Sequence, residues 1–276
     1  MAGQPSGCSG MSPQPKKNLL GILVDPIDRA EAAALVVEAA QQSRTFSVSA
    51  IAVHGIMTGV LDRIHRYRLN HLELVVCDGQ PVRWALNLLH RSGPRERVYG
   101  PNLMRDVLDS AAQKKIPVFF FGSTADVLAK MCCNLKQRHP GLLIAGAEPS
   151  SFGPVSPQSA DALAARIRSS GAKIVFVGLG CPRQEVWAYE YRERIGLPIV
   201  AVGAAFPFAA GTLRQAPKWM QDRGLEWLFR LCSEPRRLWR RYLVLSPIYL
   251  MLVFFQWLGF SFRETGLAPT GEILYG

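Results

Sequence analysis

The middle of the chain predicts an α/β protein. Between residues 46 and 203, short apolar runs alternate with longer segments that carry apolar residues at helical spacing. Such alternation is typical of repeated βα units, which form a mostly parallel sheet with helices on both faces. The composition agrees, because 49% of the 276 residues are hydrophobic and 19% are charged, which suits a folded core and excludes a mainly disordered chain. We therefore expect a Rossmann-like α/β core, followed by a basic helical appendage and an apolar terminal segment.

Each expected element follows from its local pattern. Short apolar runs of strand length predict strands at 46–53, 72–77, 117–122, 142–147, 173–179 and 198–203. Apolar residues at helical spacing predict helices at 30–42, 100–114, 124–138 and 156–170. Because ligands of such sheets bind at the carboxyl ends of strands, near a topological switch point, the residues that directly follow the strands are the candidates for a site.

Changes in composition divide the chain into five parts. Residues 1–17, rich in Ser, Gly, Pro and Gln, are expected to form a disordered tail and lack the pattern of an export signal. The α/β core is expected over 18–212, the basic helical appendage over 213–242, the apolar segment over 243–262 and a tail over 263–276. The six cysteines include no CxxC pair, which favours a reduced, cytosolic setting.

Positive charge is concentrated in the appendage. The chain has 32 Lys and Arg against 21 Asp and Glu, a formal charge of +11, and residues 214–263 alone hold nine of the former against three of the latter. Arg236 and Arg240, like Arg237 and Arg241, are spaced i,i+4 on one side of an expected helix. Anionic partners are therefore expected, and the charge by itself leaves nucleic acid, phosphates and anionic lipid open.

The segment 243–262 is the one membrane candidate, since no charged residue lies between Arg241 and Arg263. A helix of about 20 residues would be about 30 Å long, just enough to cross the hydrocarbon core. Ser246 and Pro247, however, predict an N-cap and a first-turn proline, which would restart the helix and leave about 16 residues, or about 24 Å. A spanning helix, an interfacial or re-entrant anchor and a buried terminal helix all fit the pattern.

Two motifs follow expected strands. Asp78 comes directly after the run LVVC and before a helix, where a carboxylate can act as a general base or cap the next helix. The segment 178–185, GLGCPRQE, follows another strand and can receive a diphosphate or serve as a strand-to-helix turn; Arg183 replaces the third glycine of a dinucleotide fingerprint. No DxD, HExxH or P-loop motif occurs, so no metal site is expected.

Several motifs occur together in one order. They are Asp78-Gly79, RVYGPNLM at 97–104, VGLGCPRQE at 177–185, APKWM at 216–220, and GLEWLFR at 224–230 with EPRR at 234–237. Over about residues 19–242 the chain resembles the WecG/TagA/CpsF glycosyltransferases of bacterial wall, capsule and exopolysaccharide synthesis. The resemblance implies an inverting hexosyl- or N-acetylhexosaminyltransferase that moves a sugar from a UDP-sugar to a polyprenyl-diphosphate-linked acceptor without a metal or another cofactor.

The resemblance also implies roles for individual residues. Asp78 matches the family's proposed catalytic base, which takes the proton of the acceptor hydroxyl. The positions implied for donor binding are Ser49, Arg97, Asn102, Gly178, Gly180 and Gln184. The positions implied for acceptor or membrane binding are Arg214, Arg230, Arg237 and Arg240.

Three segments depart from the family pattern. Thr-x-Asn reads Ser49-Ala50-Ile51, Gly-Gly-x-Phe-Asp ends in Pro207, and Arg-Ala-Pro begins with Gln215. A non-catalytic subunit that binds a sugar nucleotide or lipid in a polysaccharide assembly complex therefore stays an alternative to the enzyme.

The expected partners follow from the resemblance and from the charge. They are a UDP-sugar, a lipid-linked acceptor and the membrane surface, with a homo-oligomer left open. Nucleic acid is not expected, because the basic and aromatic interleaving of common binding modules is missing. Positive charge beside the apolar segment predicts the cytoplasmic face of the bacterial inner membrane, with peripheral attachment or attachment through that segment.

Overall fold

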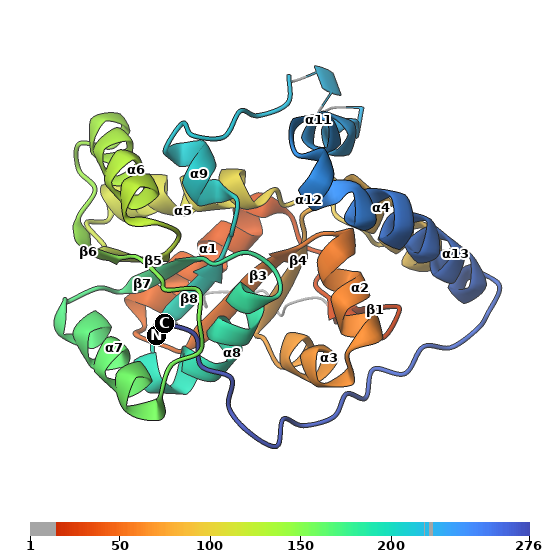
Figure 1. Cartoon of the computed structure of the whole chain (residues 1–276), viewed down its shortest axis with the longest axis horizontal. Coiled ribbons are helices and arrows are strands. Elements are labelled where there is room, and N and C mark those ends of the chain that lie inside the picture. The colour runs from red at the N-terminus through yellow and green to blue at the C-terminus, as the bar shows by residue number, and fades with distance from the viewer. Residues whose placement is uncertain (1–14, 218, 221–222) are drawn as a thin grey trace, which may run out of the picture.

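A six-stranded parallel sheet forms the centre of the protein (Figure 1). The computed structural model describes residues 15–217, 219–220 and 223–276. The strand order is β4-β3-β8-β7-β5-β6, and every neighbouring pair is parallel. The strands are β3 (Phe46–Ile51), β4 (Leu74–Cys77), β5 (Val118–Gly122), β6 (Ile144–Glu148), β7 (Ile174–Gly178) and β8 (Pro198–Ala201). All six predicted strands are confirmed, and so is the parallel α/β architecture.

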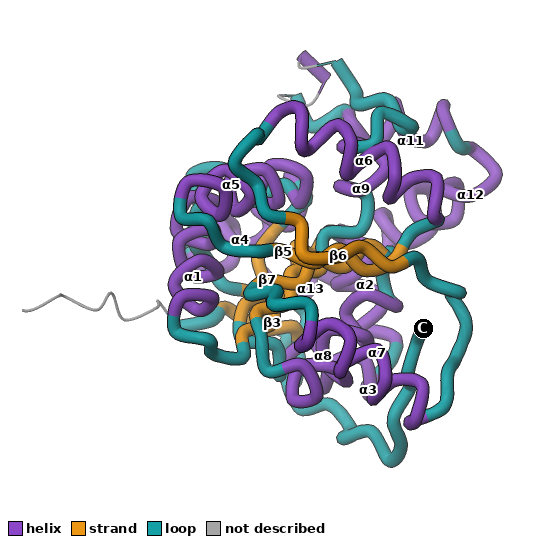
Figure 2. The backbone as a smooth tube through the Cα atoms, turned by 90° about the vertical axis from the view of Figure 1, so that its left-hand side faces the viewer, coloured by secondary structure: helices purple, strands orange, loops and turns teal. Residues whose placement is uncertain are grey.

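Helices cover both faces of the sheet (Figure 2). One face packs against α1 (Arg29–Gln41), α5 (Gly100–Gln113), α6 (Ala125–Arg138) and the short α9 (Ala205–Ala209). The other packs against α2 (Val53–Leu61), α3 (Arg63–Asn70), α4 (Gln80–His90), α7 (Pro157–Ser169) and α8 (Arg183–Ile195). Side chains alternate between the two core clusters along each strand, as the pleat requires: Phe120 and Phe176 face the first set of helices, and Phe119 and Val175 the second.

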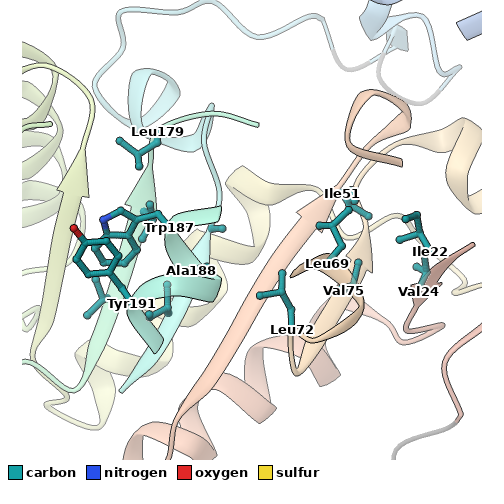
Figure 3. Packing of buried hydrophobic residues seen from close by; sticks show 14 of the residues in the cluster. Ile22, Val24, Ile51, Leu69, Leu72, Val75, Leu179, Trp187, Ala188 and Tyr191 are labelled. Atoms are coloured by element: carbon teal, nitrogen blue, oxygen red, sulfur yellow. The ribbon is translucent and has the colours of Figure 1, made fainter. Parts of the chain in front are cut away.

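The second core contains a feature that the sequence analysis did not predict. A hairpin of β1 (Lys17–Leu19) and β2 (Ile22–Val24) lies beside β4, and its Ile22 and Val24 side chains pack near Val75 (Figure 3). Leu20 and Gly21 both have positive φ, the conformation that a two-residue turn needs to follow the twist of its strands. The predicted tail over 1–17 therefore overlaps β1 at its last residue, and residues 1–14 lie outside the described part of the chain.

The appendage is helical, as predicted. It contains α11 (Glu226–Ser233), α12 (Pro235–Trp239) and the start of the π-helical turn η1 (Arg240–Leu245), and α13 (Ser246–Trp257) follows within the predicted apolar segment. The predicted restart at Ser246 and Pro247 is wrong, because Leu245 and Ser246 keep helical dihedral angles and the helix is continuous over Pro235–Trp257. The wider turn of η1 ends at Leu245, two residues before Pro247, which explains how a residue without an N–H is accommodated.

Pro235–Trp257 is long and apolar enough, by length and composition, to cross a membrane. The segment after it, 263–276, which the sequence predicts to be a tail, runs back along the body of the protein and ends beside Gly153 and Pro154, next to Tyr191 of α8 (Figure 1). Leu274 is buried there, and Tyr275 pairs with Pro154 in an isolated bridge.

Candidate active site

A cavity of about 520 Å³ opens at the carboxyl edge of the sheet. Its walls are formed by the residues that follow β3, β4, β7 and β8, including Ala52, Asp78, Leu179 and Gly203. The topological switch point lies here. After β4, at one edge of the sheet, the chain crosses to the other half of the sheet and forms β5 on the far side of β7. The predicted location of the site is therefore the location of this cavity.

Asp78 lies in the cavity wall, directly after β4. The alternative that it caps the next helix is wrong, because Gly79 is the N-cap of α4 and the helix has no side-chain cap. Instead, the backbone N–H of Gly100, at the start of α5, donates to Asp78 Oδ1 at 3.3 Å. Burial raises the pKa of Asp78 from 3.8 to about 6; the nearby Arg97 charge opposes this shift, and the Glu226 carboxylate adds to it. Asp78 is thus a carboxylate that gains a proton close to neutral pH.

An ion pair joins the core to the appendage beside Asp78. Arg97 Nη2 lies 2.7 Å from Glu226 Oε2 of α11, and both side chains are largely buried. The Arg97 guanidinium also lies 4.5 Å from the centre of the Tyr99 ring, which lines the cavity. Arg97 is therefore held by Glu226 and Tyr99 and does not itself line the cavity.

Arginines of the appendage also line the cavity. Arg230, Arg237 and Arg241 come from α11, α12 and η1, and all three line the cavity. Arg237 is paired with Glu234. Among the described residues, no carboxylate lies within ion-pairing distance of Arg230 or Arg241, and Arg230 Nε is buried without a hydrogen-bond partner. Two guanidinium groups beside an enclosed space provide donors for an anionic ligand.

Two predicted basic positions lie elsewhere. Arg214 and Arg240 are exposed and line no described cavity. Arg240 lies over the Trp239 ring, with 5.3 Å to its centre. Asn102 lines a separate hollow of about 390 Å³ on the other side of Pro101, together with Arg105 and Arg138.

A buried polar network supports the cavity floor. Ser49 Oγ donates to Glu185 Oε1 at 3.0 Å, and Gln184 Nε2 donates to the same oxygen at 2.8 Å. Ser49 is fully buried behind the wall, whereas the three residues that follow it, 50–52, line the cavity. Gln184 Oε1 and Glu185 Oε2 are buried without a hydrogen-bond partner among the described residues, and both side chains belong to the cavity lining, so the floor holds two unused acceptors.

Glycine is required at the two positions of the predicted phosphate turn for different structural reasons. A Cβ on Gly178 would lie 2.5 Å from the Phe206 ring, so glycine is needed there for packing. Gly180 has a φ of 78° and meets nothing within 4 Å, so glycine is needed there for the backbone conformation. Both line the cavity at the start of α8.

A sequence model described as the glycosyl transferase WecG/TagA/CpsF family matches residues 17–263, most of the chain. The chain belongs to this glycosyltransferase family. WecG/TagA/CpsF proteins act in cell-wall glycan synthesis, and membership implies a sugar-nucleotide donor and a lipid-linked acceptor. The resemblance stated from the motifs is therefore confirmed.

Several residues of the site were not singled out from the sequence. They are His54, Tyr99, Glu185, Glu226 and Arg241. Glu185 and Glu226 could have been found as the acidic residues inside the quoted motifs, because a carboxylate among basic residues is expected to form an ion pair or a hydrogen bond when it is buried. His54 gave no signal beyond being a lone histidine; burial and the Arg241 charge lower its pKa to about 4, so it is neutral at physiological pH. Within the described residues, no group of three or more His, Cys, Asp or Glu could hold a metal ion.

Proposed function

We propose that the protein is an inverting glycosyltransferase that moves a hexosyl or N-acetylhexosaminyl group from a UDP-sugar to a polyprenyl-diphosphate-linked acceptor. The reaction would serve exopolysaccharide or other envelope glycan synthesis at the cytoplasmic face of the inner membrane. One observation carries the proposal: Asp78, with a pKa of about 6, lines a cavity that Arg230 and Arg241 also line, and neither arginine has an ion-pair partner among the described residues. The donor nucleotide, the lipid carrier and the inversion come from the family resemblance.

Asp78 acts as the general base. The acceptor hydroxyl oxygen attacks the anomeric carbon, and its proton passes to the Asp78 carboxylate. The bond between the anomeric carbon and the donor phosphate oxygen breaks, so UDP leaves with the bonding electrons. A single displacement of this kind inverts the anomeric centre. A base with a pKa of about 6 is mostly ionised at pH 7 and still accepts a proton readily.

The cavity arginines bind the diphosphates. Arg230 and Arg241 donate to phosphate oxygens of donor and acceptor, and Arg237 joins them when it exchanges Glu234 for phosphate. Their positive charge stabilises the leaving UDP without a metal ion. Arg97 is a positioning residue, because its pairing with Glu226 fixes α11 over Asp78 and its charge lowers the pKa of Asp78.

The floor and turn residues hold the donor sugar. Gln184 and Glu185 accept hydrogen bonds from sugar hydroxyls, and Ser49 orients Glu185 from behind. Gly180, whose Cβ position is open, lets the donor approach the start of α8 closely, while Gly178 makes room for the Phe206 ring. Asn102 lies in the first turn of α5, where its backbone N–H donates to the carbonyl oxygen of Tyr99 at 2.9 Å.

The test is UDP release by detergent-solubilised protein that is given candidate UDP-sugars and a lipid-diphosphate acceptor. Asp78→Asn should abolish acceptor-dependent release, while UDP-sugar binding, measured by calorimetry, is kept. Asp25→Asn is the matched control, because Asp25 is also a buried carboxylate with a raised pKa but lies outside the cavity. Normal turnover by Asp78→Asn would remove Asp78 as the base. Tight UDP-sugar binding by the unaltered protein without transfer to any acceptor would favour the non-catalytic subunit instead.

A further inference from the structure

The C-terminal helix has two unlike sides. Tyr249 and Val253 of α13 are buried against the body, with 1% and 5% of their surfaces exposed. Leu250, Phe254 and Trp257 point away from it and are each more than half exposed. We call this the apolar surface. The helix α4 packs against α13 and exposes two further large apolar side chains, Trp84 and Leu88. A group of exposed large apolar side chains of this kind marks an interaction site.

The helix is fixed lengthwise against the body. Near its middle, the Tyr249 hydroxyl donates to the carbonyl oxygen of Pro81 at 3.2 Å. At its end, Gln256 Nε2 donates to the carbonyl oxygen of Asn18 at 3.0 Å, and Gln256 Oε1 accepts from the N–H of Leu20 at 2.9 Å. A helix that crosses a bilayer next to a water-soluble domain would have to give up these contacts.

The chain after the helix stays on the same side. Asn18 Nδ2 donates to the carbonyl oxygen of Phe262 at 2.9 Å, and Asn70 Nδ2 donates to that of Glu264 at 2.9 Å. Further on, the Tyr191 hydroxyl donates to the carbonyl oxygen of Tyr275 at 3.0 Å. Figure 1 shows this segment passing from the end of α13 across the body. Both ends of the apolar stretch are therefore attached to one folded unit.

We propose that α13 is a monotopic anchor, which lies in the plane of the membrane and inserts the apolar surface into one leaflet. The occupant is lipid because of the charge and aromatic pattern. The exposed Arg240 and Arg263 flank an uncharged stretch, where they can meet anionic headgroups. Trp239 and Trp257 are exposed near the two ends of that stretch, at positions suited to the membrane interface.

The anchor also orients the active site. Arg237 and Arg241, which line the cavity, belong to the same continuous helix as the apolar surface. The 23 residues of this helix span about 34 Å, so a helix lying in the membrane plane holds the arginine wall at headgroup level. This consequence rests on the proposed function, because it presents the cavity to a lipid-linked diphosphate. The anchor itself is measured without sugar transfer, so its failure and the failure of the proposed function are distinguishable.

The first test is sedimentation with vesicles of phosphatidylcholine and phosphatidylglycerol. Leu250→Glu should weaken binding at least about tenfold, since it loses the burial of a leucine and adds a carboxylate that lipid disfavours. Leu143→Glu is the matched control, because Leu143 is 47% exposed and lies by β6, outside the apolar surface. Undiminished vesicle binding by Leu250→Glu would overturn the proposal. If Leu250→Glu binds vesicles normally but converts a dimer of the unaltered protein into a monomer, the apolar surface contacts a second copy of the chain and not lipid.

The second test measures topology. Thr270→Cys introduces a thiol at an exposed position of the segment that follows α13. The natural Cys133, exposed on α6, serves as the reference thiol, because its labelling shows on which side of the membrane the folded body lies. The protein is added to preformed sealed vesicles and treated with a membrane-impermeant maleimide. The monotopic anchor predicts that both thiols react equally before detergent is added. A thiol at position 270 that reacts only after detergent would show that the helix crosses the bilayer and would overturn the proposal.

Discussion

Replacing Asp78 by asparagine is expected to stabilise the protein while abolishing its activity. The carboxyl group is placed where its ionised form is disfavoured, so its pKa rises from 3.8 in the unfolded chain to about 6 in the fold. Each unit of this pKa difference lowers the free energy of unfolding of the ionised protein by about 1.4 kcal/mol, which gives about 3 kcal/mol in total. Asp78 is only partly buried and faces a cavity, so solvent reduces this to about 1–2 kcal/mol.

The pH dependence separates this effect from ordinary repacking. Below about pH 4, Asp78 is protonated in both the folded and the unfolded chain, so replacing it by asparagine adds little stability. Above about pH 6, the unfolded chain carries an ionised carboxylate that the fold disfavours, so the full gain is present. Asparagine keeps an oxygen that can accept from the Gly100 N–H, so the start of α5 is preserved.

Thermal unfolding of both proteins between pH 4 and pH 7.5 is the assay. At pH 7.5, the Tm of Asp78→Asn should be about 3–6 °C higher, and the difference should shrink toward zero at pH 4. In the same preparation, kcat should fall by about 10²–10⁴-fold, and kcat/KM of the unaltered protein should decline as pH falls through about 6. A difference in Tm that is equal at both pH values, or of opposite sign, would show that the fold does not disfavour the ionised form of Asp78.

Three further substitutions probe the rest of the site. Arg230→Ala should lower kcat/KM about 10- to 100-fold in steady-state assays, because a charge-assisted contact to phosphate is lost, while the exposed Arg236→Ala should change it less than about twofold. Glu226→Gln should lower stability by about 2–3 kcal/mol in denaturant unfolding, because its arginine partner loses a buried ion pair. It should also move the acidic limb of kcat/KM to lower pH, since Glu226 raises the pKa of Asp78. Gly178→Ala should cost about 1–3 kcal/mol in the same unfolding assay, because its Cβ would overlap the Phe206 ring; an unchanged midpoint would contradict that packing.

The sheet could be predicted because its strands are short apolar runs that the sequence separates clearly. The run expected at 117–122, for example, is β5 at Val118–Gly122. The β1–β2 hairpin was missed because its strands have three residues each and no Asn-Gly or Asp-Gly turn. The continuity of the helix through Pro247 was missed because a π-helical turn has no sequence signal of its own.

Site residues that directly follow a strand could be predicted from the sequence, whereas those placed by contacts between residues far apart in the sequence could not. Asp78 could be located from the run before it, because the carboxyl edge of a parallel sheet is fixed by strand direction. The pairing of Arg97 with Glu226 joins residues 129 positions apart and could not be read from either motif. The orientation of Ser49 depends on strand parity, so a register shift of one residue exchanges it with the cavity-lining Ala50.

Sugar transfer by direct displacement at Asp78 is tested most directly by mass spectrometry and NMR of a lipid-diphosphate acceptor after incubation with the purified protein and a panel of UDP-sugars. We expect the acceptor to gain one sugar with an anomeric configuration opposite to that of the donor. A product of retained configuration would contradict a single displacement, and UDP-sugar binding without any product would contradict the assignment as an enzyme.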